Sequence, residues 1–281
     1  MSSKTYWQDR ELEWKKKRLK DEKQYADEIQ EIYANMMDSV EKEIESFFTR
    51  YANKENITMA EAKKRVSNID IQAYQRKAKK YVKEKNFSDE ANEQMRLYNL
   101  AMKVNRLELL KANIGLELVA GHDELKSYTG DKLEGAYLEE LKRNASILGD
   151  TVIDNAKMAK TVADSSFKNA TFSERIWVNQ EQLKNSLSSV LSNALIQGKN
   201  PREFIPQIRK KFDVSRCNAE RLLRTEIARV QTQAQAESYE ANGIDEYEYI
   251  ACSLKDVCPL CKEMDGKVFK LKDMEIGENA P

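Results

Sequence analysis

Three of the chain's four cysteines lie in one short stretch, CSLKDVCPLCKEMDGKVF, which runs from Cys252 to Phe269. Cys258 and Cys261 have the CxxC spacing that lets two thiolates bind one tetrahedral Zn²⁺ from a tight loop. A CxxC pair supplies only half of the ligands that such a site needs. Cys252 is the candidate third ligand, although a small buried hydrophobic side chain explains it equally well.

Candidates for the remaining ligands are few. The single histidine, His122, is far away in sequence at an expected helix end, where a capping or surface role is favoured over metal binding. Asp256 and Asp265 offer oxygen, whereas structural zinc prefers sulfur and nitrogen. A redox role needs the first cysteine at a helix N-terminus in a βαβ context, and a hairpin is expected here instead. A zinc site, metal-free packing of the thiols and, least favoured, a redox pair remain as interpretations.

The composition favours long exposed helices. The 281 residues include 33% charged residues but only 9 Gly and 4 Pro. The 47 basic residues balance the 47 acidic ones, so any attraction to nucleic acid must come from a local patch. We expect neither a membrane span nor a signal peptide, because no apolar run approaches the roughly 20 residues that a span needs. A cytosolic protein keeps its thiols reduced, which disfavours a disulfide.

The first half of the chain predicts long helices. An apolar stripe with steps of three and four residues runs from Tyr25 to Tyr51, and it serves either as core or as an interface. Ahead of the stripe lies a basic run that is a weak candidate for phosphate binding and is better explained as a solvated helix face: Lys15, Lys16, Lys17, Arg18 and Lys20.

Two further N-terminal helices are expected. Thr58 with Glu61 forms a capping box at the start of the first, and Ser88 starts the second, which is expected to end near Gly121. The polar stretch from Ala163 to Arg175 is the best candidate for a linker.

The second half begins with another apolar stripe, from Leu183 to Leu195, closed by Gly198. Helix starts are predicted at Asn200-Pro201 and at Ser215, and Gly243 ends the last helix. Glu246–Ala251 and Lys267–Leu271 then alternate as short strands, with a turn at Asp265-Gly266.

The helix around RLLRTEIARVQTQA carries a set of charged residues. Arg221 lies three residues before Arg224, and Glu226 three before Arg229, which predicts polar faces away from the apolar residues. An ion pair of this spacing, such as Glu226 with Arg229, is predicted to be an ordinary surface feature. The sequence has no Gly-rich phosphate loop, nucleophile elbow or paired His–carboxylate set, so hydrolase and nucleotide-dependent chemistry have no support.

These patterns predict a mainly α fold. We expect a long-armed helical N-terminal region over residues 1–165 and a small α+β domain over 166–281, consisting of helices and a C-terminal β-hairpin with a CxxC knuckle.

The order of motifs in the second half resembles the phage head morphogenesis family, the Mu F-like minor head proteins. The matching elements are an Arg-Thr-Glu triplet, a strand leading to an aspartate, a CPxC pair and an Asp-Gly: Arg224, Thr225, Glu226, Asp256, Cys258, Cys261, Asp265 and Gly266. The likeness weakens toward Trp177, and the first half is similar mainly in being helical.

The resemblance implies a structural virion protein without enzymatic activity in this part of the chain and without a small-molecule substrate. It would lie inside the head of a tailed bacteriophage near the portal, after assembly in the host cytoplasm, and act in head assembly and in DNA packaging or ejection. The implied partners are the portal and capsid or scaffold proteins, with DNA contact and self-association through the N-terminal helices as further expectations.

The resemblance also implies a way to complete the knuckle. In the family a following segment with His and Cys supplies two more ligands, whereas this sequence ends at GENAP. We therefore expect the domain to be truncated at its C-terminal end, and bound Zn²⁺ only if the full-length protein holds those ligands. The alternative is a zinc-dependent nucleic-acid-binding module, with Cys252, Cys258 and Cys261 on the metal and the basic run on phosphate.

Overall fold

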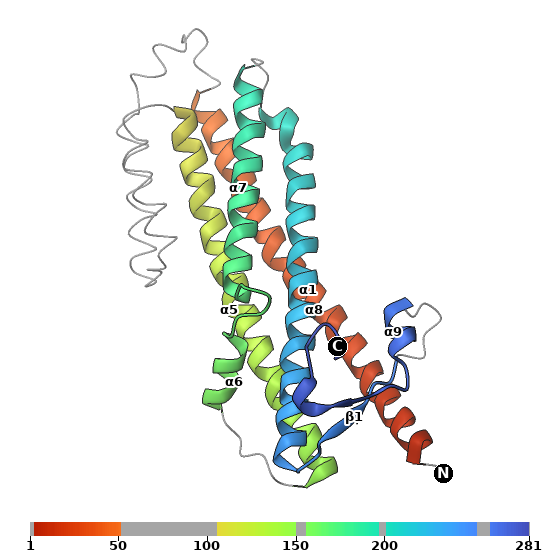
Figure 1. The fold of residues 1–281 in the computed structure, drawn as a ribbon. Coiled ribbons are helices and arrows are strands. Elements are labelled where there is room, and N and C mark those ends of the chain that lie inside the picture. The colour runs from red at the N-terminus through yellow and green to blue at the C-terminus, as the bar shows by residue number, and fades with distance from the viewer. Residues whose placement is uncertain (1–2, 52–105, 150–155, 197–200, 252–258, 281) are drawn as a thin grey trace. The chain divides into compact units, whose positions relative to one another are not determined.

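The computed structural model describes residues 3–51, 106–149, 156–196, 201–251 and 259–280, and helices dominate this part of the chain (Figure 1). Its α-helices are α1 (Ser3–Tyr51), α5 (Arg106–Leu148), α6 (Ala156–Ala163), α7 (Phe172–Ile196), α8 (Ile205–Ala241) and α9 (Pro259–Met264). It also contains the 3-10 helices η1 (Pro201–Phe204) and η2 (Leu271–Asp273), and the strands β1 (Glu246–Glu248) and β2 (Val268–Lys270). The predicted mainly α fold with a short C-terminal hairpin is confirmed.

The chain forms two compact units. The first unit is Met1–Leu125 with Ile176–Glu220, and the second unit is Lys126–Arg175 with Arg221–Pro281. Each unit thus combines two segments that are separated in the sequence. The division at residue 165 stays a prediction.

The apolar stripe of α1 is part of the core of the first unit. All five described members of the stripe between residues 29 and 44 are buried, as their helical spacing predicted: Ile29, Ile32, Met36, Val40 and Ile44. Between them, the ring of Tyr33 makes edge-to-face contacts with His122 of α5 and Phe212 of α8. This stripe is therefore a core feature, while the side chains of Phe47 and Tyr51 lie outside the described part.

The helix end predicted near Gly121 is wrong. Gly121 lies inside α5, which continues to Leu148. A Cβ added at Gly121 would lie 2.0 Å from Cγ of Met36, so this glycine permits close contact between α5 and α1. His122 consequently lies in mid-helix and is fully buried, and its predicted capping or surface role is also wrong.

A second predicted boundary, the N-cap at Ser215, is also wrong. Helix α8 is continuous from Ile205 to Ala241, and the Pro201 start leads into it through η1. Ser215 is buried, with its Oγ 2.9 Å from the hydroxyl oxygen of Tyr33. Ser215 therefore lies inside a helix and makes a tertiary hydrogen bond, and it does not cap a helix end.

Gly243 ends α8 as predicted. It has a φ of +67°, and its N–H donates to the carbonyl of Glu240 at 3.0 Å, while the N–H of Ile244 donates to Tyr239 at 3.0 Å. These two bonds are those of a Schellman motif, in which a glycine adopts the left-handed conformation without a steric penalty.

The hairpin that follows is short. Strands β1 and β2 are antiparallel, with Tyr247 opposite Phe269, and their stacked rings lie 5.7 Å apart. Gly266, in the predicted Asp-Gly turn, has a φ of +75°. The predicted pair of strands is confirmed, with α9 lying between them in sequence.

Several predicted features lie outside the described residues: the capping boxes at Thr58 and Ser88, and the helix end at Gly198. Within the described ranges, no helix combines the length and the apolar content that a membrane span requires.

Candidate functional site

The Arg-Thr-Glu triplet of α8 splits between solvent and core. Arg224 and Thr225 are exposed, and Thr225 Oγ1 donates to the carbonyl of Arg221 at 3.0 Å. Glu226 is fully buried. It lies three residues after Leu223 and four before Val230, both of them buried, so it belongs to the apolar stripe of the helix. The predicted ion pair of Glu226 with Arg229 is present, but its predicted surface location is wrong, because both side chains lie in the core.

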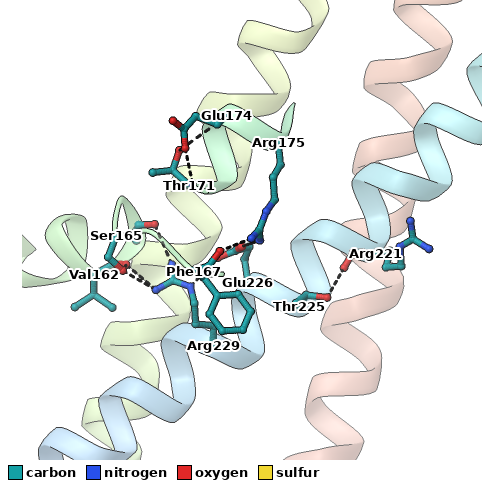
Figure 2. A network of polar contacts seen from close by, with 11 residues as sticks. Val162, Ser165, Phe167, Thr171, Glu174, Arg175, Arg221, Thr225, Glu226 and Arg229 are labelled. Carbon is teal, nitrogen blue, oxygen red and sulfur yellow. Dashed lines mark hydrogen bonds and ion pairs between the residues drawn. The ribbon is translucent and has the colours of Figure 1, made fainter. Parts of the chain in front are cut away.

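Glu226 bridges two arginines of the second unit (Figure 2). Its Oε1 lies 2.7 Å from Nη1 of Arg175, and its Oε2 lies 2.7 Å from Nε of Arg229. Arg175 extends toward it from the first turn of α7. A buried carboxylate is costly unless it is paired and hydrogen-bonded, and here both of its oxygens are engaged by guanidinium groups.

Arg229 also holds the end of α6. Its Nη1 donates to the carbonyl of Val162 at 3.0 Å and to Oγ of Ser165 at 2.8 Å, and its Nη2 donates to the carbonyl of Ala163 at 3.1 Å. The last carbonyls of a helix have no intrahelical donor and form its negative end. A guanidinium, with five N–H groups and a fixed charge, satisfies them while it neutralises Glu226.

Arg175 holds the turn that follows α6. Its Nη2 donates to the carbonyl of Phe167, and its guanidinium carbon lies 5.8 Å from the centre of the Phe167 ring. Phe167 and Ala170 exchange backbone hydrogen bonds of 2.9 and 3.3 Å around Lys168 and Asn169, which both have positive φ. The segment predicted as a linker is thus an ordered connection, called the Phe167 turn below (residues 167–170).

A capping box starts α7 directly after this turn. Thr171 Oγ1 accepts the N–H of Glu174 at 3.2 Å, and Glu174 Oε2 accepts the N–H of Thr171 at 2.7 Å and its hydroxyl at 3.0 Å. The hydrogen bond from the Thr171 backbone, and then that from its hydroxyl, lower the pKa of the Glu174 carboxyl. The T-x-x-E signature was visible in the sequence and marks the helix start that the linker interpretation missed.

The network formed by Glu226, Arg175 and Arg229 is suited to holding structure. Both oxygens of Glu226 accept hydrogen bonds from guanidinium groups, which have no acceptor atoms of their own. The hydrogen bonds of Glu226 in this network therefore go to groups that hold the backbone around α6 in place. The sequence signal for it was the acidic residue within the apolar stripe of α8, whereas nothing local pointed to Arg175.

The structure describes only one of the three candidate metal-binding thiols. Cys261 lies on α9, half-buried, and accepts a hydrogen bond from the hydroxyl of Tyr249 at 3.6 Å. Oδ1 of Asp265 accepts the N–H of Ala251 at 2.9 Å. In the described ranges no three His, Cys, Asp or Glu side chains are grouped to hold a metal ion. Cys252, Asp256 and Cys258 lie outside these ranges, so a zinc site there stays a prediction.

His122 belongs to the core of the first unit. Its Nδ1 lies 2.7 Å from the carbonyl of Leu118. Its Nε2 is buried without a hydrogen-bond partner among the described residues. Burial lowers the pKa of the imidazole to about 4, partly offset by the bond to Leu118, so the ring is neutral at physiological pH.

The basic run lies on α1. Nζ of Lys16 lies 2.7 Å from a carboxylate oxygen of Glu13, and Nζ of Lys17 lies 4.8 Å from the ring centre of Trp14. Such contacts along one helix are usual on a solvated face. Phosphate binding by Lys15, Lys16, Lys17, Arg18 and Lys20 stays a prediction.

The fold and the buried motif together define a helical protein that ends in a small α+β segment. Residues 185–281 match the family model described as Phage Mu protein F like protein. This segment is therefore similar to the Mu F-like phage head morphogenesis family, in agreement with the resemblance of its motifs. No curated protein and no solved structure matches the chain.

Proposed function

We propose that the chain is a structural minor head protein of a tailed bacteriophage, located inside the capsid and associated with the portal. In this role it acts in head assembly and in DNA packaging or ejection. The match of residues 185–281 to the Mu F-like family carries the proposal. The associated partners are the portal protein and capsid or scaffold proteins, which the chain meets in the host cytoplasm during assembly.

A non-enzymatic role is part of the proposal and is supported by the chemistry of the buried network. Glu226 is fully buried, and both of its oxygens bind arginines that also fix the backbone around α6. A residue used in this way contributes rigidity. A rigid segment suits a protein whose task is to bind other proteins in an assembled particle.

Purified phage particles provide the test of location. After protease treatment of intact particles, the chain is expected to remain full-length, and it should become digestible once the heads are opened. Absence of the chain from purified particles would overturn the proposal, and digestion in intact particles would overturn the interior location.

Association with the portal is tested separately. The tagged full-length chain, co-expressed with the portal protein of the same phage, is expected to retain the portal on an affinity resin, whereas an unrelated helical protein with the same tag should not. Equal recovery of the portal on both would contradict the portal association.

The same preparations distinguish the zinc-dependent nucleic-acid-binding module. That alternative requires one zinc per chain by elemental analysis and DNA affinity that falls steeply with added salt. It also requires that replacing Lys15, Lys16, Lys17, Arg18 and Lys20 by glutamine weaken DNA binding and reduce the salt dependence.

A further inference from the structure

The last residues of the second unit form a closed loop, called the C-terminal loop below (Asp273–Ala280). Asn279 closes it, because its Oδ1 accepts the N–H of Glu275 at 2.7 Å and its Nδ2 donates to the carbonyl of Asp273 at 2.8 Å. The N–H of Gly277 donates to the carbonyl of Ala280 at 2.7 Å. The loop is therefore internally bonded and can act as one piece.

The C-terminal loop lies against the Phe167 turn. A Cβ added at Gly277 would lie 3.4 Å from Cζ of Phe167 and 3.6 Å from Nζ of Lys168. Gly277 has a φ of +84°, a conformation that glycine adopts without strain. The backbone of the loop thus lies beside the Phe167 ring, which also neighbours the guanidinium of Arg175 and the ammonium of Lys168.

The loop is also bonded to the hairpin. The hydroxyl of Tyr247 on β1 donates to Oδ1 of Asn279 at 3.0 Å and to its carbonyl at 3.2 Å. Tyr247 in turn stacks on Phe269 of β2. A two-stranded hairpin is at best marginally stable in water by itself, so it requires support from neighbouring structure.

We propose that Arg175 is a positioning residue that holds the C-terminal hairpin in place: its ion pair with Glu226 fixes the Phe167 turn, and that turn supports the C-terminal loop and the β1–β2 hairpin. One guanidinium makes all the necessary contacts, to the Glu226 carboxylate, the Phe167 carbonyl and the Phe167 ring. Arg175 precedes the segment that matches the family, so this support comes from outside it. The proposal is independent of the function proposed above.

Hydrogen exchange on the full-length chain tests this positioning role. In Arg175→Met, the amides of Tyr249, Leu271 and Gly277 are expected to exchange at least about tenfold faster, because local opening of the hairpin becomes easier. These amides are chosen because each donates to a backbone carbonyl within the hairpin or loop. Amides in the middle of α5 should keep their wild-type rates.

Arg143→Met is the matched control, since Arg143 forms a similarly shielded ion pair with Glu140 at 2.7 Å within the second unit. It should leave the exchange of the hairpin unchanged. Equal acceleration in both variants would show a general loss of stability and would overturn the proposal, as would wild-type hairpin exchange in a folded Arg175→Met protein.

Two further variants keep the test decisive. Arg175→Lys retains a charge for Glu226 but lacks the planar fork that bonds two groups at once, so the hairpin amides should still exchange faster. If Arg175→Met does not fold, Phe167→Leu removes only the ring contact and should produce the same local acceleration. Unchanged exchange in a folded Phe167→Leu protein would then overturn the proposal.

Discussion

Glu226 and Arg229, one turn apart on α8, form an ion pair with 2.7 Å between the carboxylate Oε2 and the guanidinium Nε, and their side chains are 0% and 5% exposed. Pairs with this spacing usually lie on the surface and stabilise a helix by only about 0.2–0.5 kcal/mol. Here the pair is shared with Arg175 and with the carbonyls at the end of α6, so breaking it leaves buried groups without partners.

Glu226→Gln is therefore expected to lower the free energy of unfolding by about 3–5 kcal/mol, the usual result when one partner of a buried ion pair is removed. Urea unfolding measures the change. Glu220→Gln on the same helix is the control, because Glu220 pairs with Arg216 nearer to solvent and should lose no more than about 1 kcal/mol. Equal losses in the two variants would contradict the buried network.

Two glycines of α5 should respond in opposite ways to alanine. Gly121→Ala is expected to destabilise the protein by about 1–3 kcal/mol, because its Cβ would overlap Cγ and Sδ of Met36. Gly135→Ala should stabilise it by about 0.5–1 kcal/mol, since nothing lies within 4 Å of the new Cβ and alanine favours the helix. Thermal unfolding of both variants gives the comparison, and changes of the same sign would refute the close α1–α5 contact.

His122 should make stability depend on pH in a defined window. Its pKa in the folded protein is lowered to about 4 from the usual 6.5, so below pH 6.5 the unfolded chain binds a proton that the folded chain does not. Stability should therefore fall by about 3 kcal/mol as pH decreases from 6.5 to 4, and this contribution should level off below that.

The measurement is the difference between the wild-type and His122→Leu unfolding free energies across this pH range. Both proteins have the same carboxyl groups, so the contributions of those groups cancel in the difference. Since the chain has a single histidine, no other imidazole titrates in this range. Parallel pH profiles would show that His122 titrates normally and is not buried.

The hydrogen bond between Tyr33 and Ser215 should appear as a coupling energy of about 1 kcal/mol in a double-mutant cycle of Tyr33→Phe and Ser215→Ala. Burial raises the pKa of the Tyr33 hydroxyl to about 12, although the hydrogen bond with Ser215 acts in the opposite direction. A cycle of Tyr33→Phe with Thr225→Ala, which removes an exposed hydroxyl of the other unit, should give no coupling. Additive changes for Tyr33 and Ser215 would rule out their bond.

The sequence predicted those features that local physics determines. The stripe from Ile29 to Ile44 is buried because its period matches the helix, and Gly243 ends α8 because only a left-handed residue closes that helix. The similarity to the Mu F-like family likewise rests on residues that are close in sequence.

The sequence could not reveal features that distant contacts determine. Gly121 and Ser215 have the residue types of helix ends, yet one admits Met36 and the other bonds Tyr33 within continuous helices. Glu226 is buried because Arg175, 51 positions away, neutralises it. The spacing of apolar residues within one helix cannot predict a partner that is so far away in the sequence.

The bond between Tyr33 and Ser215 also constrains how the protein is made. The two residues are 182 positions apart, and at about 5–20 residues per second a ribosome needs about 10–40 s to add them. During that time the apolar side of α1 already exists, whereas its partner on α8 has not yet been made. In that interval α5, which carries Gly121 and His122, is the neighbour that can cover the stripe, and the contacts of Tyr33 with α8 are completed last.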